Sequence, residues 1–222
     1  MNAEPFAILE QGARALTLSL DDQKLQLLLD YLALIQKWNQ VYNLTALREP
    51  DKMLTHHLLD CLAMLPALAR QLEDRTPVGS EGLKLLDVGA GAGLPGVVIA
   101  ICCPDISVTC VDAVAKKVGF IQQVAAVLKL SNLRGLHARV ETLTGAFDVI
   151  CSRAFASLLD FTTGSSAALA RGGIWLAMKG KEPTDEIAQL GAEVTVFHVE
   201  HLQVPGLDAQ RCLVWMRRSS ET

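Results

Sequence analysis

The stretch LLDVGAGAGLPG, residues 85–96, decides the fold class of this chain. Its apolar first half predicts a buried strand, and Gly91, Gly93 and Gly96 then satisfy the pattern G-x-G-x-x-G at the turn into a helix. Glycines at such a turn adopt backbone angles that other residues avoid, and they let a ligand approach the main chain closely. The pattern alone also fits a tight turn that binds nothing, so the neighbouring residues have to distinguish the two interpretations.

An acidic residue just before the glycines sharpens the interpretation. Asp87 stands two residues before Gly89, at the carboxyl end of the predicted strand. Its carboxylate could order the loop or, through a water molecule, hold the ammonium group of a cationic cofactor. Because the same charge would repel a pyrophosphate, the run acid-x-Gly-x-Gly-x-Gly favours S-adenosylmethionine over a dinucleotide.

Residues at the ends of the next three predicted strands extend the candidate cofactor site. Asp112 follows the first loop glycine by 23 residues, close to the spacing of about 20 at which an acid binds ribose hydroxyls. Val140 and Glu141 could hold an adenine through a backbone amide and an acidic side chain, or simply form a surface loop. Arg153, in the motif SRAFAS (152–157), could bridge cofactor and substrate or stabilise the rim of the sheet.

Outward from this loop, short apolar runs alternate with helical segments. Buried strands are predicted at 83–88, 107–112, 133–138, 147–152 and 173–179, with helices near 95–103, 114–130, 157–170 and 184–191. The last two apolar runs, 193–202 and 211–218, have no helix between them and are expected to pair as a hairpin. The pattern predicts an α/β protein of Rossmann-like type, with a doubly wound, mostly parallel sheet and an antiparallel last strand.

The region before the sheet predicts a helical cap and no second enzyme. Apolar residues recur at helical spacing over 21–41, and a second helix is expected over 51–72, with a bend at Pro66. A turn-rich stretch, 76–82, separates the two parts. We therefore expect an N-terminal helical cap over 1–75 and an S-adenosylmethionine-binding core over 83–218.

Composition limits the class of protein. The chain has 222 residues, of which 50% are hydrophobic, enough for one sizeable α/β core. The first residues do not resemble a secretory signal, and the apolar runs are shorter than the roughly 18 to 20 residues of a membrane span. The six cysteines form no CxxC pair and are interpreted as reduced core residues. A cytoplasmic protein without a membrane partner is expected.

Two groups of residues invite a ligand and are interpreted as structural. His56, His57 and Asp60 suggest a metal, but no further ligand is apparent, so no metal is expected. Trp38, with Tyr42 and Asn43, could stack on or read RNA. Aromatic residues at helical spacing are more often part of a core, and packing is the favoured interpretation.

The charge is distributed unevenly. The chain has a formal net charge of -4, yet residues 113–181 carry nine basic against three acidic side chains, a net of +6. Such an asymmetry is typical of a surface that docks a polyanion, although a solvated surface would show it as well. Candidate contacts to phosphates or bases, chosen by charge and by position near strand ends, are Lys116, Lys117, Arg153, Lys179 and Lys181.

Taken together, the motifs resemble those of the glucose-inhibited division protein B family, also called ribosomal RNA small subunit methyltransferase G. The resemblance covers nearly the whole chain and depends on KWNQVYNLTA (37–46), HHLLD (56–60), LLDVGAGAGLPG (85–96), VDAVAKKVGFIQQV (111–124), SRAFAS (152–157) and AMKGK (177–181). It implies transfer of a methyl group to N7 of a guanine in small-subunit (16S) ribosomal RNA. The cofactor contacts that it implies are Gly89, Leu94, Val140, Glu141 and Arg153.

The chain departs from the family pattern at Ala113 and Cys61, where serine is more common, and neither change bears on the acid Asp112. No residue is assigned to proton transfer, because guanine N7 holds a lone pair and loses no proton on methylation. Cys151 is expected to point into the core. Two other classes stay open from the residues: a nucleotide-sensing binding protein without turnover, and an NAD-dependent oxidoreductase, for which too few residues remain to form a substrate domain.

Overall fold

The computed structural model describes residues 3–47, 49–73 and 82–219. Most of the turn-rich stretch 76–82, the predicted boundary between cap and core, lies outside these residues. The centre of the molecule is a seven-stranded sheet in the order β3-β2-β1-β4-β5-β7-β6. Its strands are β1 Leu83–Val88, β2 Ile106–Asp112, β3 Leu133–His137, β4 Phe147–Arg153, β5 Leu169–Lys179, β6 Val194–Leu202 and β7 Arg211–Arg218.

The strand directions confirm the predicted sheet. β1 to β5 pair in parallel, whereas β7 runs antiparallel to both β5 and β6. The two final strands form the predicted hairpin, and β7 lies between β5 and β6. Because β1 has β2 on one side and β4 on the other, the chain changes direction across the sheet at the loop after β1, where open α/β sheets bind their ligands.

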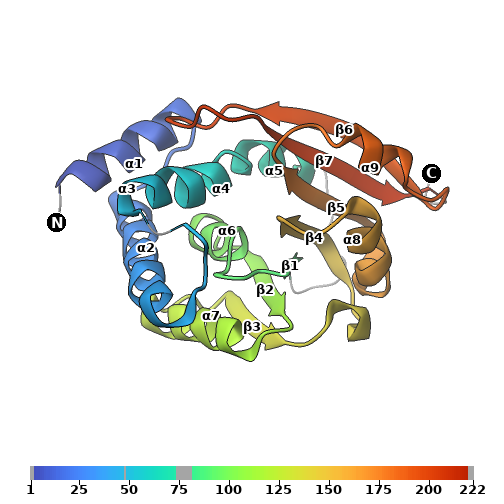
Figure 1. Cartoon of the computed structure of the whole chain (residues 1–222), viewed down its shortest axis with the longest axis horizontal. Helices are drawn as coiled ribbons and strands as arrows, with labels where there is room; N and C mark the ends of the chain where they lie inside the picture. Colours follow the sequence, from blue (N-terminus) through green and yellow to red (C-terminus); the bar gives the residue numbers. More distant parts are fainter. Residues whose placement is uncertain (1–2, 48, 74–81, 220–222) are drawn as a thin grey trace.

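Helices cover both faces of the sheet, which explains the nearly continuous apolar runs of its strands. Figure 1 shows α2 (Asp22–Tyr42), α6 (Gly96–Cys102) and α7 (Ala115–Val127) on one side, and α8 (Leu158–Ser165) and α9 (Thr184–Ala188) on the other. Alternate strand residues point to opposite faces. Leu85 accordingly packs in the cluster under α6, and Leu86 packs in the cluster under α8.

The N-terminal cap contains more elements than predicted. It begins with α1 (Ala3–Ala15), which the sequence interpretation did not include, and continues with α2. The expected helix 51–72 is interrupted: it consists of α3 (Pro50–Met53), a π-helix (Leu54–Leu59), α4 (Asp60–Leu62) and α5 (Leu65–Leu72). Pro66 lies in the first turn of α5, where its missing amide costs no hydrogen bond.

The cap and the sheet share one apolar interior. Leu28 and Ile35 of α2 belong to the same buried cluster as Val97 of α6 and Leu176 of β5. In the described part of the chain, no helix is long and apolar enough to cross a membrane.

Candidate functional site

The glycine loop between β1 and α6 has the geometry that its sequence predicts. Gly89, Gly91 and Gly93 have φ angles of +65°, +59° and +89°, which residues with a side chain rarely adopt. The Tyr31 hydroxyl of α2 donates a 2.7 Å hydrogen bond to the carbonyl of Ala92. The loop is therefore fixed by its own glycines and by a cap helix beneath it.

Asp87 lies under this loop and organises it. The carboxylate is completely buried, and its Oδ2 accepts the amide of Gly96 at 2.9 Å. Burial raises the pKa of Asp87 to about 7, although the hydrogen bond from Gly96 opposes the shift. Oδ1 is buried with no hydrogen-bond partner among the described residues. The direct contact seen is with the loop, and a water-mediated contact with a cofactor stays a prediction.

Asp112 forms part of a small cavity of about 230 Å³ beside the loop. Its Oδ2 accepts the amide of Gly91 at 3.0 Å, and its Oδ1 accepts the amide of Val114 at 2.8 Å. A carboxylate has about four lone-pair directions, so both oxygens can still accept a ribose hydroxyl. The cavity is also lined by Gly89, Val140, Glu141 and Phe155. Carboxylates beside apolar side chains fit the hydroxyls and the base of a nucleoside.

A larger cavity of about 680 Å³ is lined by the loop residues 89–92 and by Leu94, and it shares Gly89 with the first cavity. Its charged lining residues are Asp60, Lys117, Arg153, Lys179 and Arg211. Four of these are cations, and Asp60 is the one carboxylate that the described residues contribute to this lining. The ammonium of Lys179 is paired with Glu186 at 2.8 Å. The excess of positive charge favours an anionic ligand such as a nucleic acid backbone.

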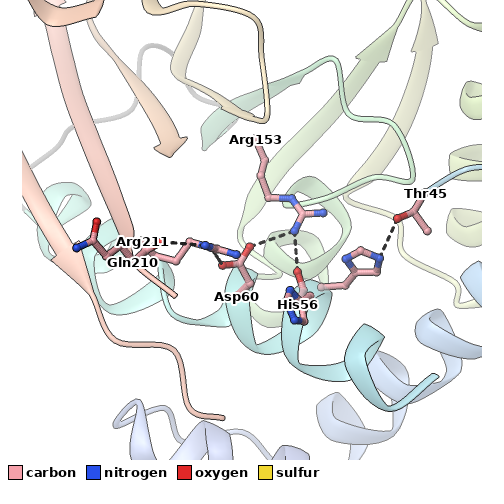
Figure 2. A network of polar contacts seen from close by, with 7 residues as sticks. Thr45, His56, Asp60, Arg153, Gln210 and Arg211 are labelled. Atoms are coloured by element: carbon pink, nitrogen blue, oxygen red, sulfur yellow. Dashed lines mark hydrogen bonds and ion pairs between the residues drawn. The ribbon is translucent and has the colours of Figure 1, made fainter. Parts of the chain in front are cut away.

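Arg153 is held from the side of the cap, as Figure 2 shows. Its Nη1 donates to Oδ2 of Asp60 at 3.1 Å and to the carbonyl of His56 at 2.9 Å. The Nε of Arg211 donates to Oδ1 of the same carboxylate at 2.7 Å. The side chain of Asp60 is only 5% exposed, so this ion triple is shielded from water.

Side-chain hydrogen bonds also fix the loop over residues 43–47, a wall of the larger cavity. Oδ1 of Asn39 accepts the amide of Thr45 at 2.9 Å, and Oγ1 of Thr45 lies 3.2 Å from Nε2 of His57 (Figure 2). Burial, assisted by the charge of Arg153, lowers the pKa of His57 to about 4. The imidazole is therefore neutral at physiological pH and is a weak base.

The structure gathers most of the predicted site residues at one edge of the sheet. Those that line the two cavities are Gly89, Gly91, Leu94, Asp112, Lys117, Val140, Glu141, Arg153 and Lys179. Asp87 and Gly93 support the loop, and Lys116 and Lys181 are exposed without contributing to either lining. The site residues that sequence reasoning missed are Tyr31, Asn39, Thr45, Phe155 and Arg211.

Three residues outside the linings can now be placed. The ring centroid of Trp38 lies 5.4 Å from that of buried Phe120, so this side chain packs between helices. Tyr42 is 39% exposed. Cys151 is completely buried in β4, and burial raises the pKa of its thiol well above the ordinary value, which makes the thiolate unavailable as a nucleophile.

Solved structures of methyltransferases share this fold. The chain is similar to TrmN from Thermus thermophilus, with a TM-score of 0.55 and 20% identity over 74% of this chain and 53% of that one. It is also similar to the ribosomal protein L11 methylase from Lactobacillus delbrueckii subsp. bulgaricus, with a TM-score of 0.51 and 18% identity over 69% of this chain and 77% of that one. The sheet order and the glycine loop after its first strand define the class I methyltransferase fold.

The family is shown by the sequence comparisons. The family model described as rRNA small subunit methyltransferase G matches residues 24–214. The chain is 68% identical, over 96% of both sequences, to the ribosomal RNA small subunit methyltransferase G of Albidiferax ferrireducens. It is 64% identical, over 96% of this chain and 93% of the relative, to the protein of the same name from Polaromonas sp.. The chain belongs to the rRNA small subunit methyltransferase G family.

Proposed function

We propose that this methyltransferase transfers the methyl group of S-adenosylmethionine to N7 of a guanine in the 16S RNA of the small ribosomal subunit, in the cytoplasm. Membership of the family supports the RNA substrate. The structural observation that carries the proposal is a pair of cavities that share Gly89 of the glycine loop. The smaller contains Asp112 beside apolar side chains, and the larger has Lys117, Arg153, Lys179 and Arg211 among its lining residues. A cofactor in the first cavity would present its methyl group to the second.

The residues present fit the cofactor. Asp112 has acceptor capacity left for the ribose, and Val140 and Glu141, which line the same cavity, are the residues that we assign to the adenine. Gly89 and Leu94 line the cavities at the loop, and Arg153 faces the same space as a cation suited to a carboxylate. When bound, S-adenosylmethionine supplies an electrophilic methyl group. The residues assigned above would bind it and orient it.

Two titratable side chains that line the larger cavity, Asp60 and His57, are consistent with N7 as the target. Asp60 is bonded to two arginines, and His57 has a pKa lowered to about 4. Neither is suited to remove a proton from an exocyclic amine. Guanine N7 loses no proton when it is methylated, so alignment of the two reacting atoms is enough. This target fits the site without an added base.

The RNA would approach over the cationic side of the larger cavity. Lys117 and Lys179 line it, and Lys116 and Lys181 lie on the exposed surface beyond. Phosphate contacts of this kind position a nucleic acid without reading its sequence. We therefore assign these lysines to docking of the RNA, either alone or within the small ribosomal subunit.

A transfer assay tests the proposal. Tritiated S-adenosylmethionine is incubated with the protein and either deproteinised 16S RNA or whole small subunits from cells that lack the enzyme. Label is expected in the RNA of at least one of the two substrates, and the comparison shows which form the enzyme prefers. Binding of the cofactor without any transfer to either substrate would support the sensing protein instead. Tight binding of NADH and none of S-adenosylmethionine would contradict the cofactor assignment.

A further inference from the structure

The cap contains a local departure from α-helical hydrogen bonding at residues 54–59. In an α-helix the amide of Asp60 would bond to the carbonyl four residues earlier, that of His56. Here the amide of Asp60 donates to the carbonyls of Thr55 and His57, so it bypasses His56. The π-helical turn therefore leaves the carbonyl of His56 available to another donor.

That donor is a side chain of the active-site edge. Nη1 of Arg153 donates to the freed carbonyl at 2.9 Å and to Asp60 at 3.1 Å. Arg153 is the last residue of β4, 93 positions after Asp60 in the chain. π-Turns within helices are frequent at functional sites, and this one supplies an acceptor that a regular helix would have used internally.

Arg211, the first residue of β7, completes the arrangement. Its Nε binds the second oxygen of Asp60, and the two arginine side chains are only 21% and 23% exposed. The two cations thus share the carboxylate of Asp60, and Arg153 also binds the carbonyl of His56. The guanidinium of Arg153 is fixed at one nitrogen, and Figure 2 shows the rest of it free of the drawn contacts. It lines the larger cavity together with Gly89 and Gly91.

We propose that the π-helical turn 54–59 and Asp60, braced by Arg211, form a socket that positions Arg153 for the groups bound in the cleft. Asp60 and Arg211 are positioning residues, because they act through Arg153. The inference rests on the proposed function in one respect, the assignment of Arg153 to the cofactor and substrate side of the cleft. If residues of the cap position Arg153, the cap is part of the active site as well as a cover over the sheet.

A double-mutant cycle distinguishes positioning from simple attachment of the cap. The variants are Asp60→Asn, Arg153→Ala and the double variant. For each, calorimetry gives the affinity for S-adenosylhomocysteine without RNA, steady-state kinetics give kcat and KM, and thermal unfolding gives Tm. Asparagine keeps the shape of Asp60 but loses its charge and one acceptor.

Asp60→Asn is expected to reduce affinity and kcat by about tenfold or more, the effect of losing a hydrogen bond between charged groups. In the Arg153→Ala background the same substitution is expected to cause less than about a twofold further loss, because its target is absent. The proposal would be overturned if the losses caused by Asp60→Asn and by Arg153→Ala added up in the double variant. It would also be overturned if Asp60→Asn left affinity and kcat unchanged. If the wild-type protein methylates no RNA, the proposed function fails, and the affinity cycle still decides this inference.

A second ion pair between cap and sheet offers a matched control. Arg70 of α5 binds Glu200 of β6, away from both cavities. Glu200→Gln is expected to change Tm slightly and to leave affinity and kcat unchanged. If Glu200→Gln lost as much affinity as Asp60→Asn, a weaker attachment of the cap would be enough to explain the loss. That result would also contradict the proposal that the socket positions Arg153.

Discussion

At the scale of single residues, environment gives two similar acids different roles. Asp87 and Asp112 end neighbouring strands, and the sequence spacing identified both. Asp87 is completely buried under the loop, whereas Asp112 opens onto the nucleoside-sized cavity. Spacing could not separate these roles, because the depth of a carboxylate depends on Gly96 and on the helices packed over it.

The first prediction concerns Asp112. Asp112→Ala removes the acceptors proposed for the ribose, and we expect affinity for S-adenosylmethionine to fall by about tenfold or more. Calorimetry measures the affinity, and circular dichroism checks that the fold persists. Ala113→Ser, next to it, restores the residue common in the family and is expected to leave affinity unchanged. Normal affinity in Asp112→Ala would refute the ribose assignment.

The second prediction concerns the pH dependence of stability. The pKa of Asp87 is raised from 3.8 to about 7, so the folded state favours its protonated form. Its stabilising effect is complete below pH 4 and is lost as pH rises through 7, by about 4 kcal/mol. The pKa of His57 is lowered from 6.5 to about 4. Its effect is complete above pH 6.5 and is lost as pH falls through 4, by about 3 kcal/mol.

Urea unfolding at pH 4, 5.5 and 7 separates the two residues. Relative to wild type, Asp87→Asn is expected to become more stable as pH rises, because the buried charge is removed. His57→Gln is expected to show the opposite trend, gaining relative to wild type as pH falls. A constant difference from wild type across this range, in either variant, would contradict the shift assigned to that residue.

At the scale of elements, the sheet was predictable and the cap only partly. The alternation of apolar runs predicted each strand to within a few residues. The absence of a helical pattern between 193–202 and 211–218 predicted the hairpin. α1 was predictable from the helical spacing of Phe6, Leu9 and Ala13. The π-turn was not, since apolar residues continue at helical spacing through it and the side chain that bonds to it, Arg153, is distant in sequence.

The basic residues of the segment 113–181 do not lie together, because its helices and strands carry them to opposite edges of the sheet. α7 begins at the carboxyl edge of the sheet and ends at the opposite edge, so Lys116 and Lys129 lie far apart. Arg171, near the start of β5, and Arg134, near the start of β3, also lie at the opposite edge. The docking surface implied by the net charge is therefore smaller than the sequence segment.

The third prediction uses that division. The double variant Lys116→Glu, Lys181→Glu is expected to weaken binding to small-subunit RNA by about tenfold and to reduce its salt dependence. Lys117 is left unchanged because it lies 3.8 Å from Asp112. The control Lys129→Glu, Arg171→Glu changes charge equally at the opposite edge. Filter binding at several salt concentrations measures both, and equal losses in the two double variants would exclude a localised docking surface.

At the scale of the whole molecule, the cap and the core are one cooperative unit in this account. They share an apolar cluster, Tyr31 anchors the glycine loop, and Asp60 anchors Arg153. The boundary predicted at 76–82 separates the cap from the core along the sequence. It does not separate two hydrophobic cores, because the two parts share one. The cleft has walls from both parts.

The fourth prediction follows from this shared interior. Trp38 reports on the cap, and Trp175 and Trp215 report on the sheet. In variants that retain only Trp38 or only Trp175, with the other tryptophans replaced by phenylalanine, the fluorescence transitions in urea are expected to match the loss of circular dichroism within each variant. A Trp38 transition at clearly lower urea than the circular dichroism of the same variant would show that the cap unfolds independently.

The identity of the methylated product tests the central claim most directly. 16S RNA from small subunits treated with the enzyme and S-adenosylmethionine is digested to nucleosides and analysed by mass spectrometry against untreated RNA. We predict a gain of 7-methylguanosine with the wild-type protein and with Cys151→Ala, and the loss of most of that gain with Arg153→Ala. A gain of 5-methylcytidine or N6-methyladenosine in place of 7-methylguanosine would contradict it.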